Sequence, residues 1–303
     1  MDIRTIRCAK SQSQLVVHTD AGCVATSWQV RGQEMLALPL ALAEFVKSQK
    51  TGGIPLLYPY ANRLRTDHFT VAGKAVDLSR DAKLKRDANG FPMHGLLIRW
   101  PDWVMSQPAP DELEASIVWG DHAELFAAYP FAHTLRVRWK LGQGRNESAN
   151  TSTLTVTTTI EANQGQDVPV SFGWHPYLVL QDRANAQLQL PARRAIALEQ
   201  NGLPVPNATP TPWLPACEQS TLAPLDDLFQ LDMRGASAAI LEPHRRIEMK
   251  FLSGYSHLQL YSPVGAHFVC IEPMTAATNA LCDGAAIVKS GDTFTAAFEL
   301  RVS

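Results

Sequence analysis

The feature that most constrains the fold is a strict alternation of polar and apolar residues. Residues 134–141 (TLRVRWKL) and 153–160 (TLTVTTTI) both alternate, and they are rich in β-branched and aromatic side chains. Because successive side chains of a β-strand point to opposite faces, this pattern is typical of strands with one buried face. A Gly-, Asn- and Ser-rich stretch, 142–152, separates the two runs, so we expect a long β-hairpin.

Comparable runs predict shorter strands along much of the chain. We expect them at residues 15–18 and 24–30, which flank a turn at 20–22, and at 188–190, 258–261, 267–272 and 294–302. No internal repeat is evident, which argues against a propeller or a solenoid. The residues therefore predict an all-β chain.

Helix signals are few. Residues 121–128 (DHAELFAA) begin with the capping residue Asp121, carry Glu124 three positions later and stop before Pro130, so we expect a short helix there. Six prolines from position 204 to position 224 exclude a central strand, because proline cannot donate to a sheet ladder. We expect that segment to be a long crossing loop.

Size and composition suit an ordinary globular protein with one domain over residues 1–303. Hydrophobic residues make up 46% of the chain and charged residues 18%, which provides ample apolar material for a core. The formal net charge is −2 and no run of Lys and Arg occurs, so neither nucleic acid nor an anionic membrane is an expected partner. A small neutral ligand fits this charge better.

Cysteine usage and the N-terminal residues point to the cytoplasm. The five cysteines form no Cys-x-x-Cys pair, so neither a disulfide framework nor a zinc knuckle is indicated, and free thiols suit a reducing compartment. The first residues lack the apolar core of a signal peptide, and no apolar run of about 18 residues occurs. We therefore expect a cytoplasmic protein.

Several common catalytic motifs are missing from the sequence. There is no Walker A loop, no Gly-x-Ser-x-Gly elbow and no His-Glu-x-x-His motif. Gly142-Gln-Gly144 lacks the third glycine of a dinucleotide fingerprint. Nucleotide, serine-hydrolase and zincin chemistries are therefore not indicated.

Two histidines stand in unusual surroundings. His94 follows a turn-forming segment, residues 89–93, and His175 lies between Trp174 and a Pro-Tyr pair that ends at Tyr177. The apolar face of a sugar stacks on aromatic rings while polar groups bind its hydroxyls. Trp174 is therefore a candidate sugar-binding residue.

Other polar residues stand beside apolar runs. Glu272 follows residues 268–271, where an ionised carboxylate is costly to bury without a partner or a function. Asn62 and Arg63 follow an apolar strand and can donate to ligand hydroxyls with fixed geometry. Asp226 and Asp227 offer one further acid, although either could equally cap a turn.

A metal site is an alternative interpretation of the same residues. His94, His175 and Glu272 are the residue types of a two-histidine, one-carboxylate centre. Neither histidine belongs to a His-x-His pair on one strand. We therefore expect no metal and no other cofactor.

Taken in order, these segments resemble the aldose 1-epimerase (galactose mutarotase) family. The resemblance is carried by Tyr-Ala-Asn-Arg at 60–63, Asn…His-Gly at 89–95, Phe-Gly-Trp-His-Pro-Tyr at 172–177, Asp-x-x-Phe at 226–229 and Cys-Ile-Glu at 270–272. It implies a large antiparallel β-sandwich of the galactose mutarotase-like type over residues 1–303, with very few short helices.

The resemblance also implies roles for individual residues. Glu272 would be the general base and His175 the general acid. The residues that would bind the sugar are Asn62, Arg63, His94 and Asp226, with Asp227 as the alternative to Asp226.

The implied reaction interconverts the α and β anomers of a hexose without a cofactor or a metal. A base removes the proton of the C1 hydroxyl while an acid protonates the ring oxygen, and the ring opens and closes on the other face. Glu272, with a reference pKa of ~4.3, is ionised at neutral pH, whereas a free histidine at ~6.5 is mostly neutral. We therefore expect nearby carboxylates such as Asp226 to raise the pKa of His175 and keep it protonated.

Three other functions fit the same residues. A hexose-6-phosphate 1-epimerase would need further cations, for which Arg65, Arg99 and Arg183 are candidates. A sugar-binding protein could keep the fold without turnover, and a metal-dependent sugar isomerase would use a metal site. The expected partner is a small-molecule sugar, and the chain is expected to act as a monomer or a homodimer.

Overall fold

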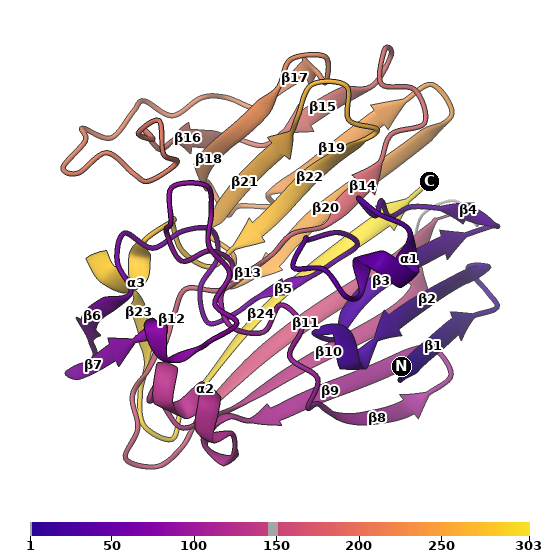
Figure 1. The fold of residues 1–303 in the computed structure, drawn as a ribbon. Coiled ribbons are helices and arrows are strands. Elements are labelled where there is room, and N and C mark those ends of the chain that lie inside the picture. The colour runs from indigo at the N-terminus through magenta and orange to yellow at the C-terminus, as the bar shows by residue number, and fades with distance from the viewer. Residues whose placement is uncertain (1, 145–150) are drawn as a thin grey trace.

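Two large antiparallel sheets dominate the structure, a computed structural model that describes residues 2–144 and 151–303 (Figure 1). The first sheet has nine strands in the order β17 (Cys217–Ser220), β15 (Gln187–Leu190), β19 (Ser237–Glu242), β20 (Arg245–Ser253), β24 (Thr293–Val302), β11 (Ser152–Ala162), β10 (His133–Gln143), β9 (Glu112–Val118) and β8 (Val104–Ala109). The second has seven: β16 (Arg193–Ala195), β18 (Leu225–Leu231), β21 (His257–Ser262), β22 (Phe268–Met274), β13 (Gly173–Trp174) and β5 (Leu56–Leu57) in order, with β14 (Tyr177–Val179) also paired to β22.

Smaller sheets and short helices complete the described part of the chain. The four-stranded sheet contains β1 (Ile3–Cys8), β2 (Ser13–His18), β3 (Val24–Val30) and β4 (Gln33–Glu34), and the two-stranded sheets pair β12 (Val168–Val170) with β23 (Ala286–Val288) and β6 (His68–Val71) with β7 (Lys74–Asp77). The α-helices are α1 (Leu42–Phe45), α2 (Ala123–Ala128) and α3 (Ala280–Asp283), and the 3-10 turns are η1 (Thr19–Ala21), η2 (Leu78–Arg80) and η3 (Trp119–Asp121). No helix within the described ranges is long and apolar enough to cross a membrane.

The long hairpin predicted from the alternation is confirmed. β10 and β11 pair antiparallel along their whole length. On β10 the side chains of Leu135, Val137 and Trp139 are buried and those between them are exposed, as a half-buried strand requires. Residues 145–150 of the expected hairpin loop lie outside the described residues.

The shorter predicted strands are also confirmed. Residues 15–18 lie in β2, 24–30 form β3, 188–190 lie in β15, 258–261 in β21 and 294–302 in β24. Of the predicted strand 267–272, all residues except His267 lie in β22. The turn expected at 20–22 overlaps η1, which Gly22 follows in the left-handed conformation. The all-β class is therefore correct.

Two local predictions need correction. The short helix exists as α2, but it begins at Ala123 after the cap residue His122, whereas Asp121 lies in the preceding turn η3. The proline-rich segment 204–224 is not entirely a loop, because it contains β17. β17 pairs with β15 at the edge of the nine-stranded sheet, so the prolines prevented a central strand and not an edge strand.

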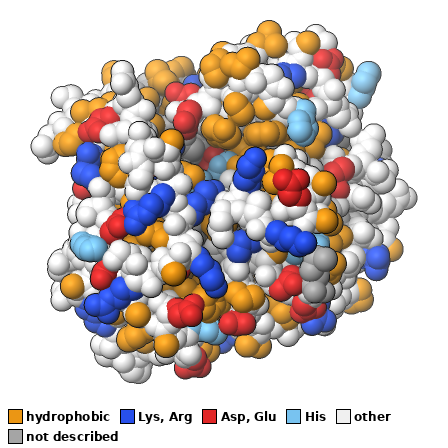
Figure 2. All heavy atoms as spheres, in the orientation of Figure 1, with side chains coloured by type: hydrophobic (Ala, Val, Ile, Leu, Met, Phe, Trp, Pro, Cys, Tyr) orange, Lys and Arg blue, Asp and Glu red, His pale blue; other side chains and the backbone are white. Residues whose placement is uncertain are grey.

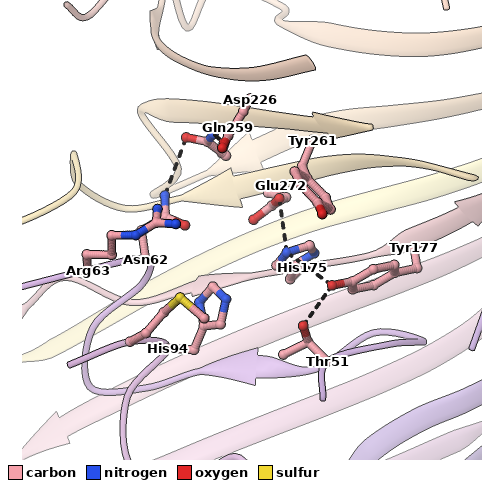
Figure 3. Close-up of a pocket in the computed structure, with 11 residues that line it drawn as sticks. Thr51, Asn62, Arg63, His94, His175, Tyr177, Asp226, Gln259, Tyr261 and Glu272 are labelled. Carbon is pink, nitrogen blue, oxygen red and sulfur yellow. Dashed lines mark hydrogen bonds and ion pairs between the residues drawn. The ribbon is translucent and has the colours of Figure 1, made fainter. Parts of the chain in front are cut away.

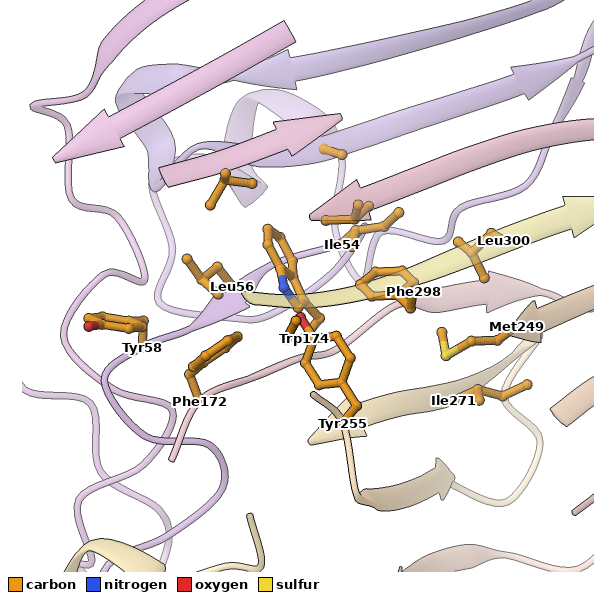
Figure 4. Packing of buried hydrophobic residues seen from close by; sticks show 14 of the residues in the cluster. Ile54, Leu56, Tyr58, Phe172, Trp174, Met249, Tyr255, Ile271, Phe298 and Leu300 are labelled. Carbon is orange, nitrogen blue, oxygen red and sulfur yellow. The ribbon is translucent and has the colours of Figure 1, made fainter. Parts of the chain in front are cut away.

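The two large sheets face each other across a shared core (Figure 4). The ring of Trp174 in β13 packs edge-on against two rings of the nine-stranded sheet. The ring centroids are 6.2 Å apart for Trp139 of β10 and 6.3 Å apart for Phe298 of β24. Its indole N–H donates to Thr158 Oγ1 of β11 at 3.0 Å. Large buried rings dominate core energetics, so these contacts hold β13 firmly against the nine-stranded sheet.

A single buried cluster contains residues from Ile6 to Val302. Elements from both ends of the described chain therefore share one core. This supports one domain over residues 1–303, which stays a prediction.

Candidate active site

A cavity of about 170 Å³ lies on the face of the seven-stranded sheet that is turned away from the core. Figure 2 shows a hollow near the middle of this side of the molecule, with Lys and Arg side chains around it. The residues that line the cavity are Thr51, Asn62, Arg63, Met93, His94, His175, Tyr177, Asp226, Gln259, Tyr261 and Glu272.

Three neighbouring strands, β18, β21 and β22, supply four of these residues. Side chains two apart on a strand share a face, so Gln259 and Tyr261 of β21 point the same way. Residues opposite each other in an antiparallel pair also share a face, and the register places Asp226 opposite Tyr261 and Glu272 opposite Gln259. Asp227 is the next residue of β18 and is not among the lining residues, so Asp226 is the acid that faces the cavity.

His175 lies in the gap between β13 and β14, where Pro176 follows it. β13 and β14 keep the same register against β22 on either side of this gap. If this register is continued through the gap, His175 lies opposite Glu272. The pairing of the strands therefore places the side chains of His175 and Glu272 next to each other.

Backbone hydrogen bonds hold the segments that carry Asn62 and His94 side by side. The N–H of His94 donates to the carbonyl of Asn62 at 2.8 Å, and the N–H of Leu96 donates to the carbonyl of Tyr58 at 2.7 Å. Asn62 and His94 have positive φ angles of 53° and 66°, a conformation that costs energy and persists only where the surroundings hold it. A Cβ at Gly95 would lie 2.1 Å from the Tyr58 carbonyl oxygen, so glycine permits the close approach that brings His94 to the cavity.

Contacts fix the ring of His175 (Figure 3). Its Nε2 lies 3.3 Å from Glu272 Oε1 and 3.4 Å from the hydroxyl of Tyr177, which hydrogen-bonds to Thr51 Oγ1 at 2.7 Å. The phenol ring of Tyr177 also stacks on the imidazole, with centroids 4.4 Å apart and 5° between the planes. An imidazole and a carboxyl group are thus held in one geometry, as proton transfer requires.

A second network lies beside this pair. Asn62 Nδ2 approaches Gln259 Oε1 at 3.4 Å, and Gln259 Nε2 donates to Asp226 Oδ1 at 2.7 Å. Arg63 Nε donates to Asp87 Oδ2 at 2.8 Å, which orients the guanidinium at the cavity. These amide and guanidinium groups can bind ligand hydroxyls.

Burial favours the neutral forms of both His175 and Glu272. Desolvation, followed by the positive charge of Lys85, lowers the pKa of His175 to about 3. Desolvation raises the pKa of Glu272 well above its usual range, and the charge of Asp226 acts in the same direction, against that of Arg63. Burial therefore opposes the expectation that carboxylates keep His175 protonated, and it favours the proton of the pair on the carboxyl group.

His94 extends the set of buried polar groups. Its ring centroid lies 5.5 Å from that of His175, and burial, with Lys85 next, lowers the pKa of His94 well below its usual value. Nδ1 of His94, Nδ1 of His175 and Oε2 of Glu272 are buried and have no hydrogen-bond partner among the residues the structure describes. Three such atoms at one cavity are suited to a polar ligand.

Trp174 does not line the cavity, so its expected role in sugar binding is contradicted. Its side chain is fully buried in the core between the sheets. Successive residues of a strand point to opposite faces, so Trp174 points away when His175 points into the cavity. The aromatic rings at the cavity are instead those of Tyr177 and Tyr261.

The other predicted site residues all line this one cavity: Asn62, Arg63, His94, His175, Asp226 and Glu272. Five further lining residues were not among the predicted site residues: Thr51, Met93, Tyr177, Gln259 and Tyr261. Gln259 is a buried amide within an apolar strand, which is the signal that singled out Glu272. Thr51 has no such signal, because it reaches the cavity from a loop.

The metal-ligand types that cluster here differ from the set considered from the sequence. His175, Cys270 and Glu272 are buried, and their possible ligand atoms all lie within 4.8 Å of one another. His94 does not belong to this group. The cluster thus combines one nitrogen, one sulfur and one oxygen donor.

The three arginines considered for a phosphate group do not line the cavity. Arg65 forms an ion pair with Glu199, and Arg99 and Arg183 donate to backbone carbonyl groups. Arg99 nevertheless lines a smaller neighbouring cavity together with Lys85.

Solved structures with the same architecture define the class of fold. The Slr1438 protein from Synechocystis sp. PCC 6803 is 25% identical with a TM-score of 0.78, over 100% of this chain and 96% of that chain. A galactose mutarotase-like protein from Clostridium acetobutylicum is 15% identical with a TM-score of 0.77, over 100% of this chain and 98% of that chain. A galactose 1-epimerase from Lactobacillus acidophilus NCFM is 13% identical with a TM-score of 0.71, over 100% of this chain and 99% of that chain. The chain therefore has the galactose mutarotase-like fold, a large antiparallel β-sandwich.

The sequence then defines the family. The family model for aldose 1-epimerase matches residues 4–298, so the chain belongs to the aldose 1-epimerase family. A search of curated protein sequences gives no match. Family membership supports a mutarotase-like enzyme.

Proposed function

We propose that the protein is an aldose 1-epimerase that interconverts the α and β anomers of a hexose. The observation that carries the proposal is the direct contact of 3.3 Å between Nε2 of His175 and Oε1 of Glu272 in one cavity. Membership of the aldose 1-epimerase family supports the same reaction.

In this proposal Glu272 is the general base and His175 the general acid. Glu272 accepts the proton of the C1 hydroxyl while His175 gives a proton to the ring oxygen, and the bond between C1 and the ring oxygen breaks to give the open-chain aldehyde. After rotation about the C1–C2 bond, the two groups take back and return these protons as the ring closes on the other face. Each positioned proton-transfer group typically contributes ~10²–10⁴ in rate.

These roles require one proton to move within the pair. Burial favours neutral His175 and protonated Glu272, so the proton must pass from the carboxyl group to the imidazole when the sugar binds. The 3.3 Å contact offers a direct path, and sugar hydroxyls that donate to Glu272 would stabilise its ionised form. The pair holds a single proton before and after this transfer.

The sugar-binding residues in the proposal are Asn62, Arg63, His94 and Asp226. Their donors and acceptors differ in kind, which allows them to distinguish the directions of the sugar hydroxyls. His94 is neutral because burial lowers its pKa, so it can either donate or accept a hydrogen bond.

Polarimetry with glucose and galactose tests the proposal. Glu272→Gln removes the base and His175→Asn removes the acid, so each should slow anomer equilibration by at least ~10². Asp227→Asn is the matched control, because it neutralises a nearby carboxylate that does not line the cavity, and it should leave the rate unchanged. Equilibration at the wild-type rate by both site variants would refute the assignment of roles.

A hexose-6-phosphate 1-epimerase is the second candidate, and Lys85 favours it. Burial, followed by the charge of Arg99, lowers the pKa of Lys85 to about 8. Lys85 also lowers the pKa of His94 and His175, so its charge reaches the cavity. A phosphate group bound beside Lys85 would offset this positive charge.

Rates on glucose and glucose 6-phosphate separate the two candidates. If the phosphate is bound by Lys85, Lys85→Met should lower kcat/KM for glucose 6-phosphate and leave that for glucose unchanged. Lys289→Met, which removes an exposed lysine paired with Asp167, is the control for loss of charge alone. Equal effects of Lys85→Met on both sugars would exclude the phosphate reading.

Two further alternatives give different results in the same assay. A sugar-binding protein without turnover would bind the sugar and not speed equilibration, and a metal-dependent isomerase would lose activity in a chelator. We include in the proposal a single domain, a cytoplasmic location and a monomer or homodimer. Light scattering and cell fractionation test the assembly and the location.

A further inference from the structure

Cys270 lies beside the proposed catalytic pair without lining the cavity. It precedes Glu272 by two residues on β22, so both side chains leave the same face of the sheet. Its thiol is fully buried, and the register places it opposite Tyr177 on one side and Tyr261 on the other. A soft sulfur donor therefore sits just behind a nitrogen and an oxygen donor.

The spacing of these donors suits a tetrahedral metal ion. With Zn–N and Zn–O bonds of about 2.0–2.2 Å, two ligands at tetrahedral angles lie about 3.3 Å apart. Nε2 of His175 and Oε1 of Glu272 already lie 3.3 Å apart. The sulfur atom of Cys270 lies within 4.8 Å of the ligand atoms of His175 and Glu272. In a tetrahedral site with a Zn–S bond of ~2.3 Å, the sulfur would lie about 3.6 Å from the nitrogen and oxygen ligands. A rotation about the Cα–Cβ bond of Cys270 changes the distance of its sulfur atom from these ligands.

Unused donor capacity is an independent observation at the same place. Glu272 is nine-tenths or more buried, and its Oε2, on the carboxyl group that supplies a ligand, has no hydrogen-bond partner among the described residues. Buried polar atoms are seldom left unpaired without a ligand or a functional reason. The cavity opens onto two of the three residues, which provides both an entry path and a fourth coordination position.

We propose that His175, Cys270 and Glu272 form a binding site for Zn²⁺ or a similar borderline-soft divalent cation, and that the bound ion excludes the sugar. The protein supplies one nitrogen, one sulfur and one oxygen ligand, and water takes the fourth position. Coordination releases two protons to solvent, the proton of the Cys270 thiol and the single proton held by the His175–Glu272 pair. Metal binding itself is independent of the proposed function; only the competition with sugar rests on it.

Cobalt and zinc titrations test the site on the full chain after treatment with a chelator. Wild-type protein should bind one Co²⁺ per chain with the near-ultraviolet charge-transfer band of a thiolate ligand, and Zn²⁺ should remove the band. Cys270→Ala should abolish the band and weaken zinc binding, measured by calorimetry, about tenfold or more. Cys217→Ser, which removes a partly buried thiol far from β22 in the sequence, is the matched control and should behave as wild type.

Competition with glucose tests the second half of the proposal. Zn²⁺ should slow anomer equilibration by wild-type protein and not by Cys270→Ala, and raising the glucose concentration should weaken the apparent affinity for zinc. In the presence of a chelator Cys270→Ala should turn over as wild type does, because its thiol is outside the proposed machinery.

Several results would overturn the inference. These are a wild-type cobalt spectrum without a thiolate band, a band that Cys217→Ser abolishes, or a Cys270→Ala protein with wild-type zinc affinity. Circular dichroism checks that Cys270→Ala is folded, and Cys270→Ser is the second variant if it is not. A thiolate band in a protein without mutarotation would refute the proposed function and leave the metal site standing.

Discussion

The Glu272 carboxyl group ties the proposed function to a cost in stability. Its pKa in the folded protein is raised above the usual value of 4.5, so the folded state holds a proton that the unfolded chain releases above that pH. The contribution of this group to the free energy of unfolding therefore falls as pH rises from the unfolded value to the raised folded value.

We predict that Glu272→Gln is more stable than wild type near neutral pH. The variant lacks this titration, so its advantage should be about 1 kcal/mol at neutral pH and should shrink as pH falls towards 4.5. Urea unfolding at a series of pH values measures the difference. A variant that is less stable than wild type at every pH would contradict the argument.

The His175–Glu272 pair also predicts the pH dependence of kcat/KM. Because burial lowers the pKa of His175 to about 3, activity should stay constant through the ~6.5 at which a free histidine titrates, and fall only on approach to the lower value. It should fall on the alkaline side when Glu272 loses the single proton of the pair. An acid limb with its midpoint at the pKa of a free histidine would show that the imidazole is not desolvated as described.

At this scale the sequence predicted which polar residues line the cavity better than how they titrate. Residue type and apolar neighbours sufficed to single out Glu272 and His175 as candidates. Period-two alternation, applied more strictly, would have separated Trp174 from His175 and paired Gln259 with Tyr261. The pKa of His175 could not be predicted, because the depth of burial depends on segments remote in the sequence.

At the scale of elements, the approach of residues 92–96 to residues 58–64 positions His94. We predict that Gly95→Ala costs about 3 kcal/mol or more, because it adds a clash with the Tyr58 carbonyl to the strain of a φ of 75°. Gly90→Ala is the matched control, since its φ is 85° and its Cβ would meet nothing within 4 Å. It should cost only about 1–2 kcal/mol.

Urea unfolding of both glycine variants decides between strain and clash. Equal losses of stability would mean that the φ angle alone requires glycine at position 95. A larger loss in Gly95→Ala, together with a lower rate of anomer equilibration, would support the role of this contact in placing His94.

Alternation predicted the strands well because it is a local consequence of one buried face. The helix α2 was also predicted, but its first residue was not. Asp121 was chosen as the cap because its side chain is of a type that caps helices, whereas the observed cap residue, His122, makes no capping hydrogen bond with its side chain. β17 escaped prediction because neighbouring prolines dominate its surroundings and an edge strand needs only one partner.

At the scale of the whole molecule, Trp174 links the two sheets. We predict that Trp174→Phe lowers stability by about 1–3 kcal/mol, because it loses packing and the hydrogen bond to Thr158, and leaves KM for the sugar unchanged. Trp213→Phe is the control, since Trp213 is 49% exposed, and should change neither. Urea unfolding measures the change in stability, and initial rates measure KM. A raised KM with unchanged stability in Trp174→Phe would show that Trp174 takes part in sugar binding.

Convergence of the site was beyond the reach of the sequence alone. Its lining residues run from Thr51 to Glu272, and they meet because β18, β21, β22 and β13 are neighbours in one sheet. That order depends on pairings between distant segments, which no local pattern encodes. The resemblance to a known family named the residues, and the register explains why they share a face.

The position of β24 has a consequence for synthesis on the ribosome. This strand lies between β11 and β20 and is the link between the two halves of the nine-stranded sheet. Until residues 293–302 have left the exit tunnel, β11 and β20 each present an unpaired edge that can recruit other chains. Nascent chains should therefore depend on chaperones until β24 has emerged, and slow decoding of residues 293–302 should increase aggregation.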